Sequence, residues 1–175
     1  VLINNFGRIS ENYDSQYVKS GTGSALLQPI GNIVTKAEPV VYWPLTSAVY
    51  NYNYSDLTRF EKIDADFYNA DDTDIDVTMG FIAGVTTITS VALGKGETFT
   101  LKAKQWTHVT YEPNISLLNT YIDITNARGL YLKFPLAESS DVNKAPKVYL
   151  DEVKMTNAKD KKKIVDMFHI KKNLI

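Results

Sequence analysis

Residues 48–69 read AVYNYNYSDLTRFEKIDADFYN, and both halves of this stretch repeat with a period of two. Over residues 63–68, apolar side chains alternate with polar ones. Over residues 50–54, tyrosine returns at every second position with asparagine between. A period of two is typical of an extended strand with one apolar and one polar face. The stretch therefore predicts two β-strands, and the first of them carries an unusual series of aromatic rings.

Similar alternation recurs along the chain. Residues 75–81 alternate apolar with polar side chains, residues 106–111 do so again before Pro113, and residues 148–155 form the last clear strand pattern. Gly, Pro, Asn and Asp separate these segments, as expected of turns. About nine short strands at spacings of about 10 to 15 residues favour an antiparallel sandwich or barrel over any helical fold.

Length and charge limit the possible function classes. The chain has 175 residues, which fits one domain with a sizeable core, and its formal net charge is −1. This charge balance argues against nucleic acid as a partner. No apolar run approaches the roughly 18 to 20 residues that a membrane-spanning helix needs, so we expect no membrane insertion. The sequence contains no Cys, which excludes disulfides and thiolate metal sites.

A change in composition near the C-terminus predicts a domain boundary. We assign residues 1–156 to one β-sandwich module and residues 157–175 to a Lys-rich linker or the start of a following domain. Residues 159–163 form a charge run, and the pattern beyond it is weakly helical. We therefore expect other domains of a larger chain to be neighbours of this one.

Five segments, in order, carry a resemblance to a known family: Ile3–Phe6, Gly21–Ala25, Ile63–Asn69, Lys104–Thr110 and Tyr149–Val153. Together they resemble the jelly-roll, galactose-binding-like carbohydrate-binding modules that are appended to polysaccharide-degrading enzymes. The resemblance implies an antiparallel β-sandwich with jelly-roll topology, and so an all-β fold class. It implies the fold with more force than the ligand, because such sandwiches also serve as structural modules.

The resemblance also implies a structural calcium ion. Asp151 matches the acidic position of the last strand, and backbone oxygens near residues 19–23 match the loop position. The acidic residue expected just after the opening Phe is missing, since Gly7 stands there. Ca²⁺ takes six to eight oxygen ligands, so this departure removes one expected ligand.

Several residue types in the chain suit sugar binding. Aromatic rings pack on the C–H faces of pyranoses, while Asn, Asp, Lys and Arg bond to the hydroxyls. The candidate carbohydrate-binding residues are Tyr42, Trp43, Tyr50, Tyr52, Tyr54, Asp64, Asp66, Tyr131 and Lys133. For the tyrosines the alternative is ordinary sheet packing, because Tyr is a favoured strand residue. For Asp64, Asp66, Tyr131 and Lys133 it is a solvated outer face.

One aromatic residue is assigned to the core instead. Trp106 matches a strand of the family whose Trp packs inside, and we therefore leave it out of the predicted site. For Tyr131 and Lys133 we expect the opposite direction, since they alternate with the apolar face of their strand.

Catalytic motifs are scarce. The chain has no Cys nucleophile, no G-x-S-x-G elbow and no H-E-x-x-H zinc motif. A glycosidase needs only two carboxylates, but nothing in the sequence singles out a pair. We therefore expect a non-enzyme.

Three functions remain, in order of preference. The first is a non-catalytic carbohydrate-binding module that attaches a secreted or cell-surface protein to a polysaccharide, such as a plant cell-wall glycan or another glucan. The second is a structural or protein-binding β-sandwich spacer of a multidomain surface protein. The third is a jelly-roll polysaccharide lyase or hydrolase. The first two place the chain outside the cell.

Overall fold

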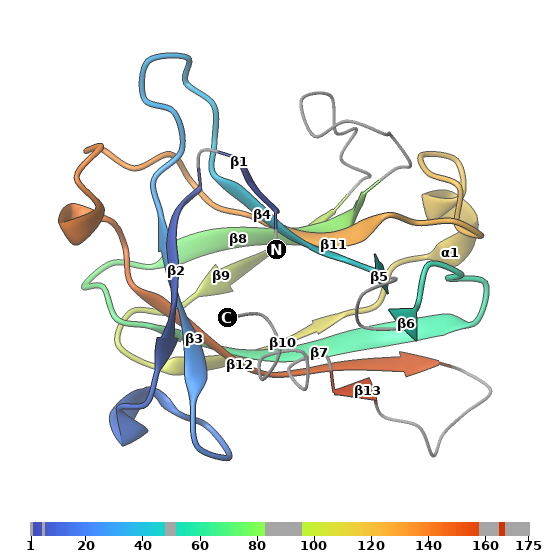
Figure 1. Cartoon of the computed structure of the whole chain (residues 1–175), viewed down its shortest axis with the longest axis horizontal. Helices are drawn as coiled ribbons and strands as arrows, with labels where there is room; N and C mark the ends of the chain where they lie inside the picture. The colour runs from blue at the N-terminus through green and yellow to red at the C-terminus, as the bar shows by residue number, and fades with distance from the viewer. Residues whose placement is uncertain (1, 5, 48–51, 83–95, 158–164, 167–175) are drawn as a thin grey trace.

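Two antiparallel sheets packed face to face make up the computed structural model, which describes residues 2–4, 6–47, 52–82, 96–157 and 165–166 (Figure 1). Sheet A contains, in spatial order, β1 (Leu2–Asn4), β4 (Val40–Pro44), β11 (Gly129–Lys133), β8 (Ile75–Ile82) and β9 (Glu97–Leu101). Sheet B contains β10 (Trp106–Tyr111), β7 (Phe60–Asn69), β12 (Val148–Asn157), β3 (Ser24–Pro29) and β2 (Gly7–Asn12), with β13 (Val165–Asp166) paired to β12.

The chain passes back and forth between the two sheets. It crosses from sheet A to sheet B between β1 and β2, and back to sheet A between β3 and β4. It returns to sheet B for β7, enters sheet A again for β8 and β9, and then changes sheet between β9 and β10, β10 and β11, and β11 and β12. All strand pairs between the described strands are antiparallel. The expected all-β jelly-roll sandwich is therefore confirmed.

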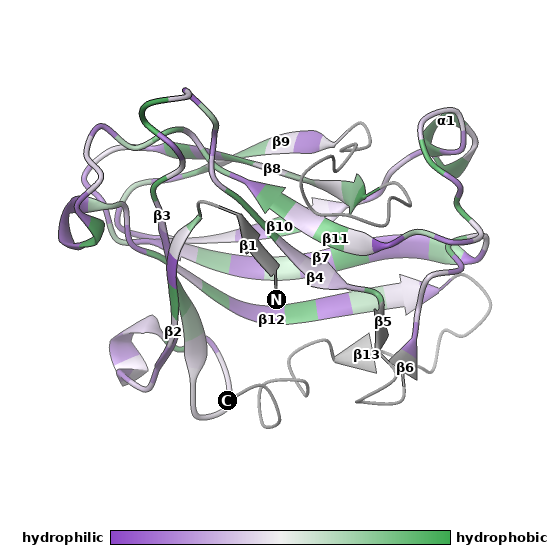
Figure 2. Ribbon diagram, turned by 45° about the horizontal axis from the view of Figure 1, so that its top comes forward, coloured by the Kyte–Doolittle hydropathy of each residue, from purple (hydrophilic) through white to green (hydrophobic). Residues whose placement is uncertain are grey.

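Alternate residues of the central strands fill the space between the sheets. On β7, Ile63, Ala65 and Phe67 are each 0% exposed, as the alternation in the sequence predicted. Leu130 and Leu132 of β11 face them from sheet A. Figure 2 shows the resulting alternation of hydrophobic and hydrophilic residues along β7 and β12. Full burial of one such aliphatic or aromatic side chain contributes roughly 1.5–3 kcal/mol, so this inner layer dominates stability.

A bulge in β12 keeps that strand in phase with the core. Glu152 has a φ of 49°, and the register against β7 shifts between Asp151 and Lys154. One extra residue at this point returns Val153 to the core cluster. Asp151 and Lys154 consequently both lie on the outer face of sheet B.

The remaining elements are short. A two-stranded hairpin joins β5 (Thr46–Ser47) to β6 (Tyr52–Asn53). Helix α1 (Ile115–Leu118) begins at Asn114, whose side chain accepts a hydrogen bond from the Leu117 N–H. Two 3₁₀ turns, η1 (Ser15–Tyr17) and η3 (Val142–Lys144), follow Asp caps. Among the described residues, no helix is long and apolar enough to cross a membrane.

Part of the C-terminal segment belongs to the sheet. Within the residues that we assigned to a linker or a following domain, β13 pairs with Lys154 and Met155 of β12. The domain boundary at residue 156 stays a prediction.

Asn69 connects the two sheets at the end of β7. Its side chain is 0% exposed, and its Nδ2 donates to the carbonyl oxygens of Thr73 at 2.8 Å and of Leu101 in β9 at 3.0 Å. Its Oδ1 accepts from the Asp71 N–H at 2.9 Å. The two parts of this amide thus satisfy three backbone groups that would otherwise be unpaired.

Replacing Asn69 by Ala should therefore destabilise the fold strongly. Each buried backbone group left without a partner costs about 1–3 kcal/mol, so we expect a loss of at least 2 kcal/mol in urea denaturation. The exposed Asn126→Ala serves as the matched control and should change stability by less than about 0.5 kcal/mol. Equal stability of the two variants would contradict the assigned role of Asn69.

Candidate functional site

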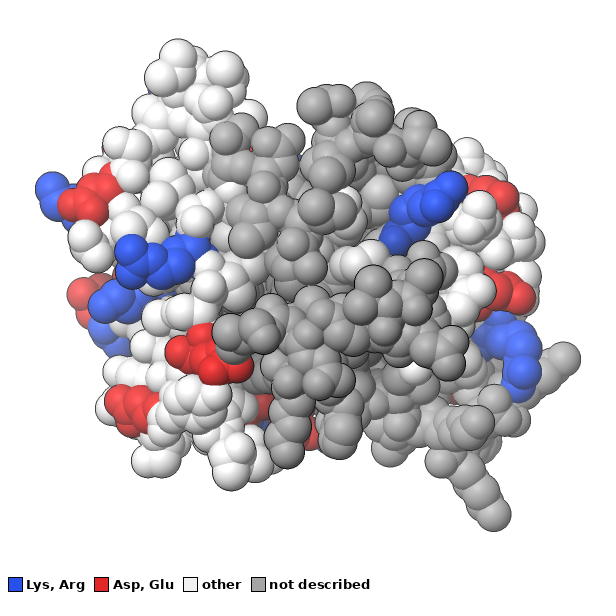
Figure 3. All heavy atoms as spheres, in the orientation of Figure 1, with Lys and Arg blue, Asp and Glu red and all other residues white. Residues whose placement is uncertain are grey.

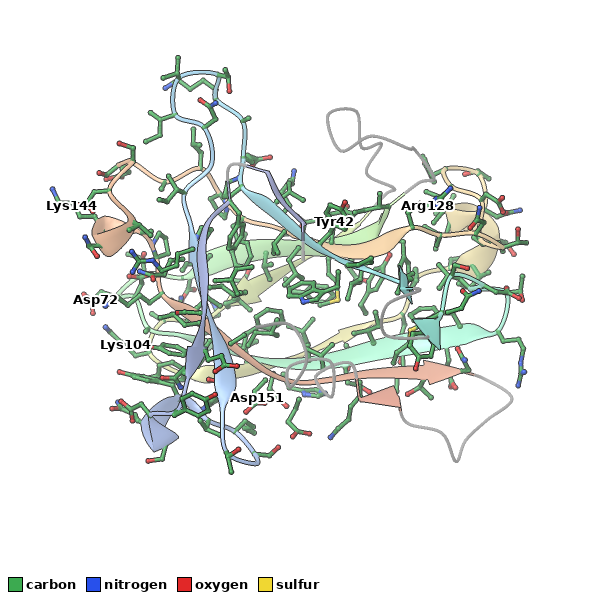
Figure 4. All side chains as sticks on the ribbon, in the orientation of Figure 1. Tyr42, Asp72, Lys104, Arg128, Lys144 and Asp151 are labelled. Atoms are coloured by element: carbon green, nitrogen blue, oxygen red, sulfur yellow. The ribbon has the colours of Figure 1, made fainter. Side chains whose placement is uncertain are left out.

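Tyr42 and Tyr131 lie side by side on the outer face of sheet A, the face turned away from the core. Tyr42 of β4 is directly opposite Tyr131 of β11 in the strand register. Figure 4 shows Tyr42 on this sheet, whereas Asp151 lies on the other sheet. Tyr131 points away from the core, as predicted, because its neighbours Leu130 and Leu132 belong to the core cluster.

Glycines give these two rings their space. Gly80 of β8 is opposite Tyr131, and a Cβ at Gly80 would lie 2.7 Å from the Tyr131 ring. A Cβ at Gly129 would lie 3.0 Å from the Tyr42 ring. The rings therefore cover the strand backbone where side chains are absent, a use of glycine that is common where an aromatic packs on a sheet.

Burial affects both hydroxyls. Tyr131 is only 2% exposed, so it is buried on the outer face of sheet A rather than solvated there, while Tyr42 is half-buried. Desolvation raises the pKa of both phenols above the usual value of 10. A phenol is already protonated at neutral pH, so the upward shift leaves both hydroxyls in the form that donates hydrogen bonds.

A row of polar side chains runs next to the two rings. Lys133, two residues after Tyr131, pairs with Thr78 of β8 in the register, and Thr78 shares a 2.8 Å hydrogen bond with Thr98 of β9. The Lys133 ammonium also lies 2.9 Å from the Glu38 carboxylate. Aromatic rings beside a row of hydroxyl and charged groups are the two components that a sugar-binding face requires.

Trp43 and Tyr54 lie elsewhere. Both pack against the hydrophobic core, and Trp43 lines an internal cavity of about 20 Å³ with Phe67, Met79 and Leu130. That volume is close to the minimum for one water molecule and cannot admit a sugar. Of the tyrosine series in the sequence, Tyr50 lies outside the described residues, and Tyr52 is described only by its backbone in β6.

Asp64 and Asp66 belong to the opposite face, on sheet B. Asp66 is 8% exposed, and its Oδ1 lies 3.1 Å from His108 Nδ1. Asp64 lies 2.9 Å from the Lys62 ammonium and accepts from the Thr110 hydroxyl at 2.8 Å. Burial alone would raise the pKa of Asp64, but the bonds from Lys62 and Thr110 outweigh it and lower the pKa. Both carboxylates are therefore bonded within the protein.

The same face of sheet B carries an aromatic cluster that the sequence did not predict. Tyr17 stacks on Tyr149 at a centroid distance of 4.1 Å and contacts Tyr68 at 5.2 Å. Tyr68 contacts Trp106 at 5.6 Å, and the Lys19 ammonium lies 5.7 Å from the Trp106 ring centroid. Assignment of Trp106 to the core was wrong, because the inward positions of β10 belong to Val109 and Tyr111.

This cluster holds the protein's own loop against sheet B. Tyr17 and Lys19 belong to the segment between β2 and β3, and each covers a ring of the sheet. Asp151 fixes the same segment, since its Oδ2 accepts from the N–H groups of Lys19 at 2.8 Å and of Ser20 at 3.2 Å. The rings and acids of this face are thus used internally, which leaves sheet A as the candidate ligand face.

The surroundings of Asp151 do not match the calcium shell inferred from the resemblance. Its Oδ1 accepts from the Glu152 N–H at 2.9 Å, so all three recorded partners of this carboxylate are N–H groups rather than oxygens. Among the described residues, no group of three or more His, Asp or Glu side chains could hold a metal ion. Calcium stays a prediction from the resemblance.

Comparison with solved structures finds 31 chains that match this one. One is a family 11 carbohydrate-binding module from Clostridium thermocellum in complex with a β-1,3-1,4-mixed-linked tetrasaccharide, with 14% identity, a TM-score of 0.51, and coverage of 90% of this chain and 87% of that chain. Another is the C-terminal family 22 module of Clostridium thermocellum Xyn10B, with 13% identity, a TM-score of 0.53, and coverage of 87% and 82%.

A third is the family 30 module of a cellulosomal cellulase of the same organism, with 13% identity, a TM-score of 0.51, and coverage of 89% and 86%. At these identities the likeness shows the fold alone. No family model and no curated protein matches the sequence.

Trp43→Ala should destabilise the protein because the ring packs against the core. Large-to-small changes at aromatic core positions cost about 3–5 kcal/mol, and we expect about 3 kcal/mol for this half-buried ring in urea denaturation. Tyr13→Ala is the control, since Tyr13 is 68% exposed. Unchanged stability of Trp43→Ala would return this ring to the list of candidate ligand contacts.

Asp151→Asn should loosen the segment between β2 and β3. An amide replaces one acceptor oxygen by a donor, so at least one of the three N–H groups loses its acceptor. Bonds to a charged acceptor contribute about 1.5–3 kcal/mol. We expect a loss of about 2 kcal/mol in urea denaturation. Measuring the Tm in calcium and again in a chelator tests calcium binding in the same experiment. If Asp151 binds calcium, the Tm of the wild type should be higher in calcium than in the chelator, and the Tm of the variant should be the same in both.

Proposed function

We propose that this chain is a carbohydrate-binding module that holds a polysaccharide on the outer face of sheet A. The observation that carries this proposal is the adjacent pair Tyr42 and Tyr131 beside the polar row of Lys133, Thr78 and Thr98. The fold supports it, because similar structures include modules that are named for binding a mixed-linked tetrasaccharide and xylan.

Binding would combine stacking with hydrogen bonds. The exposed part of the Tyr42 ring contacts the C–H face of one pyranose, and the protonated phenol donates to a ring or hydroxyl oxygen. Thr78, Thr98 and Lys133 bond to the hydroxyls of the next unit along the strands. Gly80 and Gly129 let the Tyr131 and Tyr42 rings lie close to the sheet. Affinity per site is low, and repeated modules or repeated ligand units raise it by multivalency.

The proposed role is non-catalytic. Cleavage of a glycosidic bond needs two carboxylates on either side of the bond. Among the described residues of this face, Asp76 accepts a hydrogen bond from Thr100 at 2.7 Å and Glu38 pairs with Lys133. Both acids are exposed and already bonded, and neither faces the other across the tyrosines.

The location and context follow from the ligand. A polysaccharide partner places the module outside the cell or on its surface, as part of a larger chain whose catalytic or anchoring domain it brings to the substrate. Xyn10B illustrates such a context, since its family 22 module is solved together with a GH10 module. Figure 3 shows acidic and basic side chains interspersed on the face in view, where the described residues form no basic patch for nucleic acid.

Tyr42→Ala should weaken glycan binding while the protein stays folded. Loss of one stacking ring removes about 1 kcal/mol, equivalent to about fivefold in the dissociation constant. Affinity electrophoresis against mixed-linked β-glucan, xylan, xyloglucan and an α-glucan measures the effect. Asp64→Asn, on the other sheet, is the control and should bind as wild type does.

Two outcomes would contradict the proposal. Absence of retardation of the wild type by any of these glycans would favour the structural spacer. Release of reducing ends or unsaturated products would make the chain an enzyme.

A further inference from the structure

A pocket of about 230 Å³ opens where the start of β9 meets the end of β10 and helix α1. Glu97, Glu112, Asn114 and Tyr121 contribute to its walls. Pockets for drug-sized ligands measure roughly 300–1,000 Å³. A volume of 230 Å³ therefore suits a smaller ligand, of the size of one sugar ring.

The walls of this pocket include a buried tyrosine, Tyr111. Tyr111 forms part of the lining and is 1% exposed, and its hydroxyl has no hydrogen-bond partner in the structure. Burial, followed by the influence of Tyr131 and of the Glu97 carboxylate, raises the pKa of this phenol. A buried donor without a partner is uncommon, but this hydroxyl is closed to solvent, so a ligand in the pocket meets the Tyr111 ring and not its hydroxyl.

The rim of the pocket is apolar and exposed. Tyr121 is 51% exposed and Leu117 is 45% exposed, and both line the opening. They are two of the four large hydrophobic side chains that stand exposed among the described residues. Asn114 also lines the pocket, and its Oδ1 accepts a hydrogen bond from the Leu117 N–H at 3.0 Å at the start of α1. The amide nitrogen of Asn114 is then the group that can donate to a ligand. An exposed ring next to convergent polar groups is the arrangement of a sugar subsite.

Gly96 joins this pocket to the face that carries the two tyrosines. It lines the pocket, and the space where its side chain would stand is filled by the Tyr131 hydroxyl and by Thr78. A glycan that contacts Tyr42 and the threonine row therefore has the pocket at the end of its path across sheet A.

The charge of the pocket favours neutral and amino sugars over uronic acids. Glu97 and Glu112 are the two carboxylates of the lining, and among the described residues no Lys or Arg side chain belongs to it. A uronic acid would bring a third carboxylate toward these two, and like charges at short distance repel. Neutral hydroxyls and amino groups, in contrast, donate to carboxylates.

We propose that this pocket binds one pyranose unit without an acidic substituent, at the end or at a branch of a glycan. The pyranose packs on Tyr121, and its hydroxyls donate to Glu97 and Glu112. The idea that one glycan spans both the sheet A face and the pocket rests on the proposed function. Binding of a sugar in the pocket does not, and it can be tested with monosaccharides alone.

The test uses methyl β-glucoside, methyl β-glucosaminide and glucuronate, titrated into the protein by NMR. We expect the first two to shift the amide signals of Glu97, Asn114 and Tyr121, and glucuronate to bind at least fivefold more weakly. Tyr121→Ala should weaken the glucoside at least fivefold, and Tyr13→Ala, at an exposed tyrosine elsewhere, should not. The double variant Glu97→Gln and Glu112→Gln should reduce the discrimination against glucuronate.

Several outcomes overturn the inference. These are no shift at the pocket with any of the three sugars, equal binding by wild type and Tyr121→Ala, or preference of the wild type for glucuronate. If one of these results is obtained and polysaccharides still retard the protein in affinity electrophoresis, the proposed function stands and only the pocket inference fails. Monosaccharide binding at the pocket without retardation by any polysaccharide contradicts the proposed function alone.

Discussion

Both outer faces depend on how the core is packed. Alternate side chains of β7 and β12 point inward and pack against those of β8 and β11, and the side chains between them must point outward. A shift of one residue in any of these strands would exchange its inner and outer side chains. The bulge at Glu152 shows how the chain maintains this phase, because the extra residue returns Val153 to the core and leaves Asp151 outside. Each functional side chain on either sheet is thus oriented by the apolar neighbours that precede and follow it.

The two outer faces use this scaffold differently. On sheet B, the rings of Tyr149 and Trp106 are covered by Tyr17 and Lys19, so that the aromatic surface stabilises a loop. On sheet A, glycines stand where side chains would otherwise separate the rings from the backbone. The result is a surface of tyrosine, threonine and lysine that leads past Gly96 to the acidic pocket, and we propose this continuous surface as the ligand site.

The sequence predicted side-chain direction correctly where it depends on the pattern of a single strand. Alternation predicted that Ile63, Ala65 and Phe67 are buried and that Tyr131 points away from the core. It failed where contacts join distant segments. The position of Trp106 depends on Lys19 and Tyr68, which lie in other segments of the chain, and no local pattern around residue 106 contains that information. Trp43 and Tyr54 show the converse, since both were candidate carbohydrate-binding residues and pack against the core instead.

The sequence by itself determined the fold class, because a period of two and regularly spaced turn residues constrain each strand locally. It also determined the candidate residue types, since tyrosine, aspartate and lysine carry their chemistry wherever they lie. Only the tertiary structure decided which of them share a face. Tyr42 joins Tyr131 through the β4–β11 register, whereas Asp64 and Asp66 belong to the other sheet. The physical reason is that strand pairing and sheet packing are long-range interactions, and they bring together residues that no local spacing relates.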